Sequence, residues 1–155
     1  MNLGTHGMRR KLLGLLLGLG LGLAWTETLR ADAPAGRYVL RACGTVVYDT
    51  KTRIEWQRQV PDSKKPSDQS AGVCGQLNLD GIGWRVPTLL EVLSVQDLTR
   101  KAPTIDARAF PNTPSGEYVT ATRANGVLQL VSFETGDISS NPAALVYTRC
   151  LRSRP

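Results

Sequence analysis

The sequence predicts one α+β domain, with strands near both ends of the chain and helices and long loops between them. Two stretches rich in β-branched and aromatic residues, 38–48 and 144–152, mark the two ends. A segment with a helix start signal lies between them, and the connecting segments are punctuated by proline. Strands that are separated from the helices in this way indicate an α+β rather than an alternating α/β fold.

The first half of the domain is expected to hold a β-hairpin, a polar loop and a weak helix. The hairpin pairs strands 38–48 and 54–57 across a turn that contains Asp, Thr and Lys. A loop with two prolines then covers 60–70. The weak helix follows over 71–79, where two glycines interrupt it.

The clearest helix is predicted to start at Thr88. Thr88 and Glu91 have the spacing of a capping box, in which the hydroxyl and the carboxylate each accept a hydrogen bond from a backbone amide at the helix start. We expect this helix to run to about Leu98. A long proline-containing loop should then extend over 99–117.

Three strands are expected in the C-terminal part. Segments 118–123 and 127–133 should pair as a hairpin, because Asn125 and Gly126 form a favoured two-residue turn between them. The segment 144–152 should form one closing strand.

The N-terminus has the features of a secretory signal peptide. Basic residues at 9–11 precede an apolar and glycine-rich run at 12–25, which is shorter than the roughly 20 residues that a bilayer span needs. Small residues then suit cleavage after Ala33, or after Ala35 one step later. We therefore expect residues 1–33 to be a signal peptide and 34–155 to be one periplasmic or extracellular domain. An uncleaved membrane anchor is the alternative.

Charge and histidine content restrict the function. The 155-residue chain has a net charge of +6 without a block of like charge, so an acidic partner is compatible and a nucleic-acid partner is not expected. The single histidine lies in the predicted signal peptide. The remaining domain therefore has no Ser–His–Asp or Cys–His catalysis and no histidine-ligated metal. We predict a non-enzymatic domain without metal or cofactor; a hydrolase that uses paired carboxylates is the alternative.

The chain has three cysteines, and cysteines of exported domains tend to pair. The sequence allows the bonds Cys74–Cys150, Cys43–Cys74 and Cys43–Cys150. Trp56 and Trp84 lie in apolar, strand-like contexts and are expected in the core.

Several stretches, in order along the chain, resemble the C-terminal domain of Legionella collagen-like proteins, a family of secreted bacterial domains. They cover nearly all of the chain after residue 44 and have the sequences GTVVYDTKTRIEWQR, GWRVPTLLEVLSVQD, PTIDARAFPNTPSGEYVTAT, VSFETGDI and VYTRCLR. The resemblance implies a fold similar to C-type lectin-like and formylglycine-generating-enzyme-like domains, with an irregular antiparallel sheet, two helices and long loops. The resemblance also implies an adhesive or ligand-binding function, because the namesake domain is associated with binding to sulfated polysaccharides and host surfaces.

The resemblance also suggests a disulfide pairing. In lectin-like folds the first helix is tied to the last strand, which here implies the bond Cys74–Cys150. Cys43 would then be buried and inert, with a free thiol or a crosslink between two chains as alternatives. The sequence departs from the family pattern at 119–121 and 128–130, which lack the usual tryptophans. Sugars commonly stack on such rings.

A shallow anion site is the candidate binding site. Arg149 and Arg152 flank Cys150 near the C-terminus, where charged side chains are usually solvated. Such a site would bind sulfate or phosphate polymers by charge and weaken with salt. Four loop cations complete the candidate set: Lys64, Lys65, Arg100 and Lys101. The expected partner is an acidic polysaccharide or an envelope protein. The rival interpretation is a structural envelope module that oligomerises, with Cys43 as the candidate crosslink.

Overall fold

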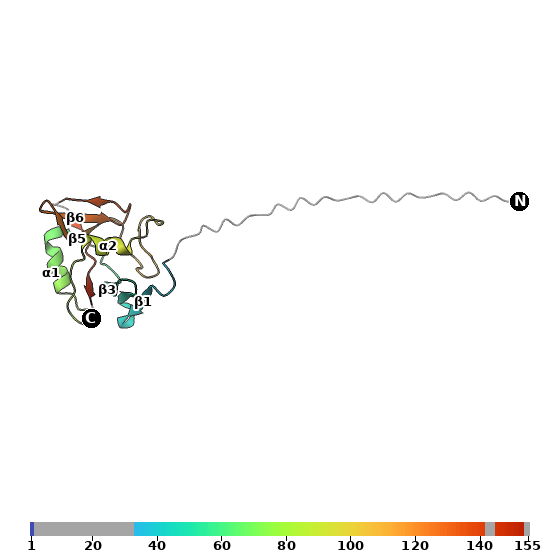
Figure 1. Cartoon of the computed structure of the whole chain (residues 1–155), viewed down its shortest axis with the longest axis horizontal. Helices are drawn as coiled ribbons and strands as arrows, with labels where there is room; N and C mark the ends of the chain where they lie inside the picture. Colours follow the sequence, from blue (N-terminus) through green and yellow to red (C-terminus); the bar gives the residue numbers. More distant parts are fainter. Residues whose placement is uncertain (2–32, 142–144, 154–155) are drawn as a thin grey trace.

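The computed structural model describes Met1, residues 33–141 and residues 145–153. It confirms the α+β class, with antiparallel sheets, two α-helices and one disulfide (Figure 1). Apart from Met1 and Ala33, the predicted signal peptide lies outside the described residues. Within those residues, no helix has the length and apolar character needed to cross a membrane.

A four-stranded antiparallel sheet forms one side of the domain. It joins the start of the chain to its end, because the last strand pairs with the third. In spatial order, its strands are β1 (Tyr38–Arg41), β2 (Val46–Asp49), β3 (Ile54–Gln57) and β9 (Leu151–Ser153).

The prediction of one continuous strand over 38–48 is wrong. The 3-10 turn η1 (Ala42–Gly44) separates β1 from β2, and these two strands pair with each other. Ala42, Cys43 and Gly44 have φ angles of 50°, 52° and 84°, in the left-handed region that an extended strand cannot use.

A second sheet is built around the predicted Asn125–Gly126 hairpin. Both turn residues have positive φ, 51° and 81°, as a two-residue hairpin turn of this kind requires. The hairpin strands are β5 (Glu117–Ala124) and β6 (Val127–Ser132), and β7 (Ile138–Ser139) extends the sheet beyond β6.

The expected single strand over 144–152 is in fact divided between two sheets. Its first part, β8 (Leu145–Val146), pairs with β4 (Lys65–Pro66), whereas β9 joins the four-stranded sheet. The segment 147–150 crosses from one sheet to the other and carries one cysteine of the disulfide.

The predicted capping box is confirmed at the start of α2 (Leu89–Val95). The Thr88 hydroxyl accepts a hydrogen bond from the Glu91 amide at 3.3 Å, and the Glu91 carboxylate accepts one from the Thr88 amide at 2.7 Å. The helix ends before the expected Leu98, because Gln96 is extended and forms a β-bridge with Ile105. The weak helix expected over 71–79 begins and ends earlier in the chain: α1 spans Ser70–Gly75 and directly follows the 3-10 turn η2 (Ser67–Gln69).

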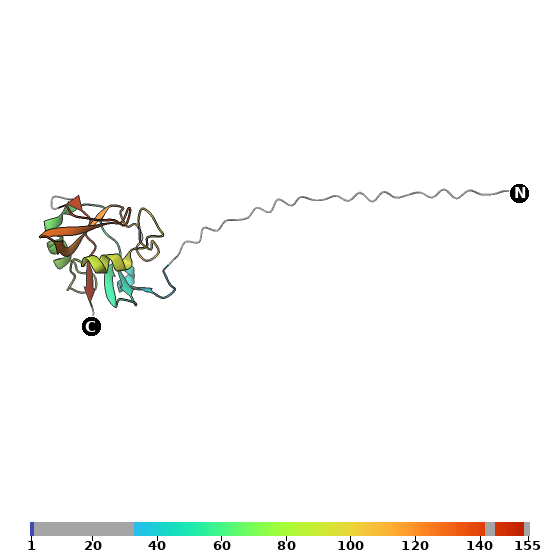
Figure 2. The same cartoon turned by 45° about the horizontal axis from the view of Figure 1, so that its top comes forward.

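The core lies between the two larger sheets and α2, which runs between them in both views (Figures 1 and 2). Trp56 and Trp84 are buried, as predicted. A second, smaller cluster surrounds the disulfide and contains Trp84 and Val46. The main cluster includes Trp56, Val92, Val95, Ile105, Phe110, Tyr118, Val131, Phe133 and Leu151.

Candidate functional site

Arg149 lies in the interior, only 2% exposed, and not in a surface anion site. One guanidinium nitrogen donates to the carbonyl oxygens of Gln57 and Arg58, at 2.7 and 2.9 Å. The other terminal nitrogen donates to the Thr113 hydroxyl at 2.8 Å. In the described part of the chain this guanidinium has no ion pair, so backbone dipoles stabilise its charge.

Aromatic rings complete the surroundings of Arg149. Its guanidinium carbon lies 4.9 Å from the centre of the Phe110 ring and 6.0 Å from that of Tyr118. Burial lowers the pKa of Arg149 to about 10, with partial compensation by Tyr118, so the side chain remains charged at neutral pH. Arg149 thus holds the crossing segment in the core and does not face a ligand.

Arg152 also has a structural role. It is 5% exposed, and its Nε donates to the Glu55 carboxylate at 2.7 Å. Glu55 is fully buried and also binds Arg41 at 2.9 Å. The guanidinium of Arg152 lies 4.7 Å from the centre of a Trp84 ring. The prediction that Arg149 and Arg152 form a surface anion site is therefore wrong, because internal partners occupy both.

The remaining four predicted cations lie at two separate places. Lys64 and Lys65 are exposed at the start of β4, and the Lys64 ammonium lies 5.3 Å from the centre of the Tyr147 ring. Arg100 and Lys101 lie in the loop after α2.

Backbone pairing sets the separation of these two places. Five extended segments lie side by side, in the order 102–104, 133–134, 116–119, 146–147 and 65–66. At about 4.8 Å between neighbours, the outer two are roughly 19 Å apart. The six predicted residues therefore do not form one site.

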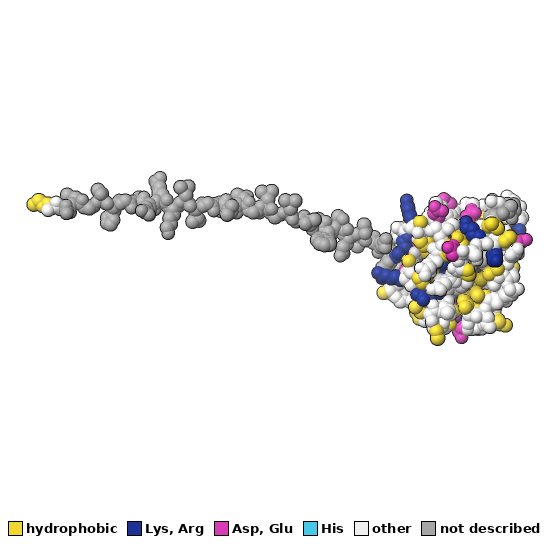
Figure 3. Space-filling model, turned by 180° about the vertical axis from the view of Figure 1, so that it is seen from behind, with side chains coloured by type: hydrophobic (Ala, Val, Ile, Leu, Met, Phe, Trp, Pro, Cys, Tyr) yellow, Lys and Arg dark blue, Asp and Glu magenta, His cyan; other side chains and the backbone are white. Residues whose placement is uncertain are grey.

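A different group of cations gathers where the chain enters the domain. We call this surface the basic edge and define it by Lys51, Arg53, Arg100, Lys101 and Arg108. Figure 3 shows dark-blue side chains gathered on the side of the domain next to the N-terminal segment.

Two contacts of the entering chain bring Lys51 and the loop that carries Lys101 to the same side of the domain. The Thr50 amide, in the β2–β3 turn, donates to the Arg37 carbonyl at 2.9 Å and brings Lys51 to this side. The Arg37 guanidinium donates to the Ser94 carbonyl of α2 at 2.6 Å. The loop that carries Lys101 follows α2 directly.

The basic edge is hollowed beside Lys101. A cavity of about 320 Å³ opens there, lined by loop residues between Thr99 and Ala107. A second cavity, of about 190 Å³, lies between Pro34 and Arg108. Ligand groups could therefore contact the loop backbone as well as the charged side chains.

Two carboxylates near this edge are buried and bound internally. Asp49 is fully buried and pairs with Arg37 at 2.9 Å. Asp106 is 7% exposed and accepts a hydrogen bond from the Arg108 amide at 2.8 Å. Neither carboxylate is presented to solvent, so the exposed charge on this side is mainly positive.

Asp97 is bound by its own loop. Burial alone would raise the pKa of Asp97, but hydrogen bonds from Thr99 and Arg100 outweigh it, so this pKa lies below its usual value. Arg100 contributes an ion pair of 2.8 Å. Glu134 has an exposed acidic side chain, and its backbone carbonyl accepts a hydrogen bond from the Ala102 amide.

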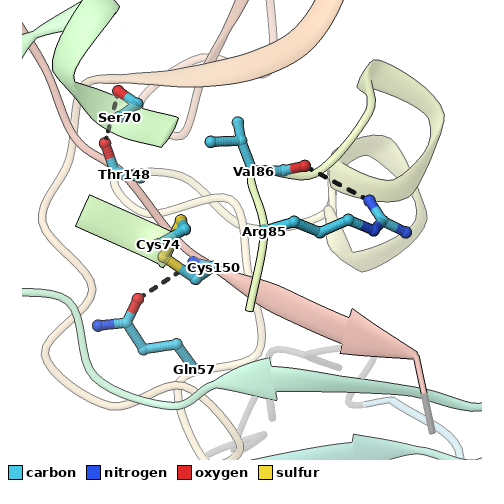
Figure 4. The surroundings of a disulfide bond; sticks show 7 residues. All are labelled: Gln57, Ser70, Cys74, Arg85, Val86, Thr148 and Cys150. Atoms are coloured by element: carbon cyan, nitrogen blue, oxygen red, sulfur yellow. Dashed lines mark hydrogen bonds between the residues drawn. A yellow bond between two sulfur atoms is a disulfide. The ribbon is translucent and has the colours of Figure 1, made fainter. Parts of the chain in front are cut away.

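The disulfide joins Cys74 on α1 to Cys150 on the crossing segment (Figure 4). Both cysteines are fully buried, and the Cys150 amide donates to the Gln57 side-chain oxygen at 3.1 Å. This is the pairing that the resemblance implied. Cys43 is a free, exposed thiol, so the expectation that it is buried is wrong.

Comparison with known protein families gives one match. The model of the Lcl C-terminal domain family matches residues 45–152, which is more than half of the chain. The chain belongs to this family. Neither the curated proteins nor the solved structures gave a match.

The matched part of this Lcl C-terminal domain contains both disulfide cysteines, the strands from β2 to β8 and the first two residues of β9. Cys43 and β1 precede it. A buried disulfide indicates an oxidising environment, extracellular or periplasmic, since cytosolic thiols are kept reduced.

The basic edge was only partly predicted from the sequence. Arg100 and Lys101 were singled out, whereas Lys51, Arg53 and Arg108 were not. The local sequence signal for all five cations is their position in turns and loops. This signal applies equally to Lys64 and Lys65, which do not belong to the basic edge, so it cannot identify the site. Which turns meet on one side depends on the contact between the entering chain and α2.

Proposed function

We propose that this Lcl C-terminal domain is an exported, non-enzymatic binding domain whose basic edge holds acidic polysaccharide. The observation that carries the proposal is the row of cations at the chain entry, beside carboxylates that are buried or bound internally. A polymer with repeated negative charges suits this row, because it can contact several of the cations at the same time. A shallow charged surface gains little from a single small anion in water.

Export is part of the proposal. The basic, apolar and small-residue segments up to residue 33 support cleavage of a signal peptide. The buried disulfide supports a final location outside the cytoplasm. An acidic polysaccharide or a protein of the cell envelope would be accessible there.

The C-type lectin-like character of the fold and the absence of catalysis are also proposed. Irregular sheets, two short helices and long loops support a lectin-like domain. The absence of histidine after residue 6 supports a binding rather than a catalytic role. A carboxylate-dependent hydrolase would have to place two acids on either side of a bond in a cleft.

Salt-dependent elution from a sulfated-polysaccharide column tests the site. The variant K51Q/K101Q should elute at clearly lower salt than the unmodified protein, because two of the cations that contact sulfate groups are gone. The matched variant K64Q/K65Q changes the net charge equally. It alters lysines at the segment 65–66, which lies roughly 19 Å from the segment 102–104 beside Lys101. It should elute close to the unmodified protein.

Two results would contradict the proposal. Equal shifts for both double variants would mean that retention follows net charge alone and that the basic edge is not a site. Failure of the unmodified protein to be retained at low salt would exclude sulfated polysaccharide as a ligand. Circular dichroism of each variant confirms that the fold is kept.

A structural module that oligomerises is a second candidate, favoured by the exposed thiol of Cys43. Two such thiols can form an intermolecular disulfide when an oxidant accepts their two electrons and two protons. We then expect a dimer on a non-reducing gel that disappears with reductant. The Cys43→Ser variant should be monomeric on the same gel. A monomer from the unmodified protein after oxidation would rule this candidate out.

A further inference from the structure

A small cavity lies between α1 and the β5–β6 hairpin, apart from the basic edge. Its volume is about 230 Å³, below the roughly 300–1,000 Å³ of pockets that hold drug-sized ligands. Its lining comes from η2, the start of α1, Val86, β5 and Leu128 of β6. The size suits a ligand of about the size of an amino acid.

An irregularity in β5 accompanies this cavity. Val119 pairs with Leu130 and Arg123 with Leu128, so three β5 residues lie opposite one β6 residue. Such a bulge redirects side chains and is common next to functional sites. Here it places Ala121 and Arg123 on the cavity wall.

The interior surface of the cavity is mainly apolar, and two of the hydroxyl groups in its lining have hydrogen-bond partners within the protein. The Ser70 hydroxyl is hydrogen-bonded to Thr148 at 2.9 Å. The Thr120 hydroxyl donates to the Gln129 carbonyl at 2.8 Å. The remaining surface is formed mainly by Ala71, Val86, Val119 and Leu128. An aliphatic group would fit against it.

Two opposite charges lie in the cavity lining, Asp68 on η2 and Arg123 on β5, and both side chains are exposed. Within the described residues, neither has an ion-pair partner. One Arg123 nitrogen donates to the Gly126 carbonyl at 2.8 Å, which leaves its other donors available.

We propose that this cavity binds a small zwitterion that carries an ammonium group, a carboxylate and a short aliphatic part. The Asp68 carboxylate accepts hydrogen bonds from the ammonium group, and the Arg123 guanidinium donates to the carboxylate. The aliphatic part packs against Val86, Val119 and Leu128. A ligand of a single charge would leave one of the two side chains unmatched. A neutral ligand would match neither.

Titration of the labelled protein, followed by amide chemical shifts, tests the proposal with two isomeric probes. L-Leucine holds its ammonium and carboxylate groups on the same carbon atom, whereas 6-aminohexanoate holds them at opposite ends of the chain. We expect at least one of them to shift amides of 67–71 and 119–123 in a saturable way. The preferred isomer reports the spacing of the two charges. Absence of saturable shifts with both isomers overturns the proposal.

Removal of each ligand charge tests the two assigned contacts. Leucinamide and N-acetyl-leucine, or the matching derivatives of 6-aminohexanoate, should bind about tenfold more weakly than the parent zwitterion, because one charge-assisted hydrogen bond is lost. The variant D68N should lose the preference for the ammonium group, and R123Q the preference for the carboxylate.

Matched variants outside the cavity serve as controls. E134Q and K64Q remove one negative and one positive charge at exposed positions outside both the cavity and the basic edge, and should leave binding of the zwitterion unchanged. If D68N and R123Q also leave it unchanged, or if all probes bind equally, the charges of the cavity do not select the ligand and the proposal is wrong.

Discussion

Replacing Arg149 with methionine is expected to destabilise the domain by about 3 to 5 kcal/mol. The substitution keeps a long side chain but removes the donors to the Gln57 and Arg58 carbonyls and to Thr113. Leaving each buried acceptor without a partner costs about 1–3 kcal/mol, and the stacking on Phe110 is lost as well. Because a domain of this size is stable by only about 5–15 kcal/mol, the loss is a large fraction of the total.

Urea unfolding followed by tryptophan fluorescence measures this effect. Arg53→Met, the same change at an exposed position, should alter the free energy of unfolding by less than about 0.5 kcal/mol. Arg149→Lys keeps the positive charge without the planar fork of donors and should fall between the two. If Arg149→Met unfolds at the same urea concentration as the unmodified protein, the buried guanidinium does not stabilise the crossing segment.

Removing the disulfide should have a similarly large effect. The bond closes a loop between residues that are 76 positions apart, so its loss frees the unfolded chain and costs about 4 to 5 kcal/mol in the chain-entropy model. The double variant C74A/C150A also removes two sulfur atoms from the smaller core cluster, beside Trp84. We expect a marginally stable or unfolded domain.

The third cysteine provides the control for this prediction. Cys43→Ala removes a thiol that is exposed and outside the bond, so the urea midpoint should remain that of the unmodified protein. Reductant should lower the midpoint of both the unmodified protein and Cys43→Ala, and should leave C74A/C150A unaffected. A midpoint for C74A/C150A equal to that of the unmodified protein would show that the bond does not stabilise the fold.

Local sequence signals predicted the parts of the fold that depend on neighbouring residues. The capping box at Thr88 and Glu91 and the turn at Asn125–Gly126 each involve residues close in sequence, and both were confirmed. The burial of Trp56 and Trp84 followed from their apolar context. The disulfide pairing came from the family resemblance, since cysteine count alone allowed three pairings.

The errors arose where distant segments decide the structure. The position of Arg149 near the chain end predicts a solvated side chain, whereas its hydrogen-bond partners lie 36, 91 and 92 residues away in the sequence. The local pattern at the end of the chain predicts one strand, because the pairing of Val146 with Lys65 and of Leu151 with Trp56 depends on segments far away in the sequence. The basic edge likewise depends on which turns meet beside the entering chain.

The most direct test of the proposed binding surface is chemical-shift mapping with a sulfated oligosaccharide on the labelled domain. We predict saturable shifts at 51–53, 100–102 and 107–109 that weaken as salt is added, and little change at 64–66. Shifts centred on 64–66, or spread evenly over all exposed lysines and arginines, would contradict a binding site at the basic edge.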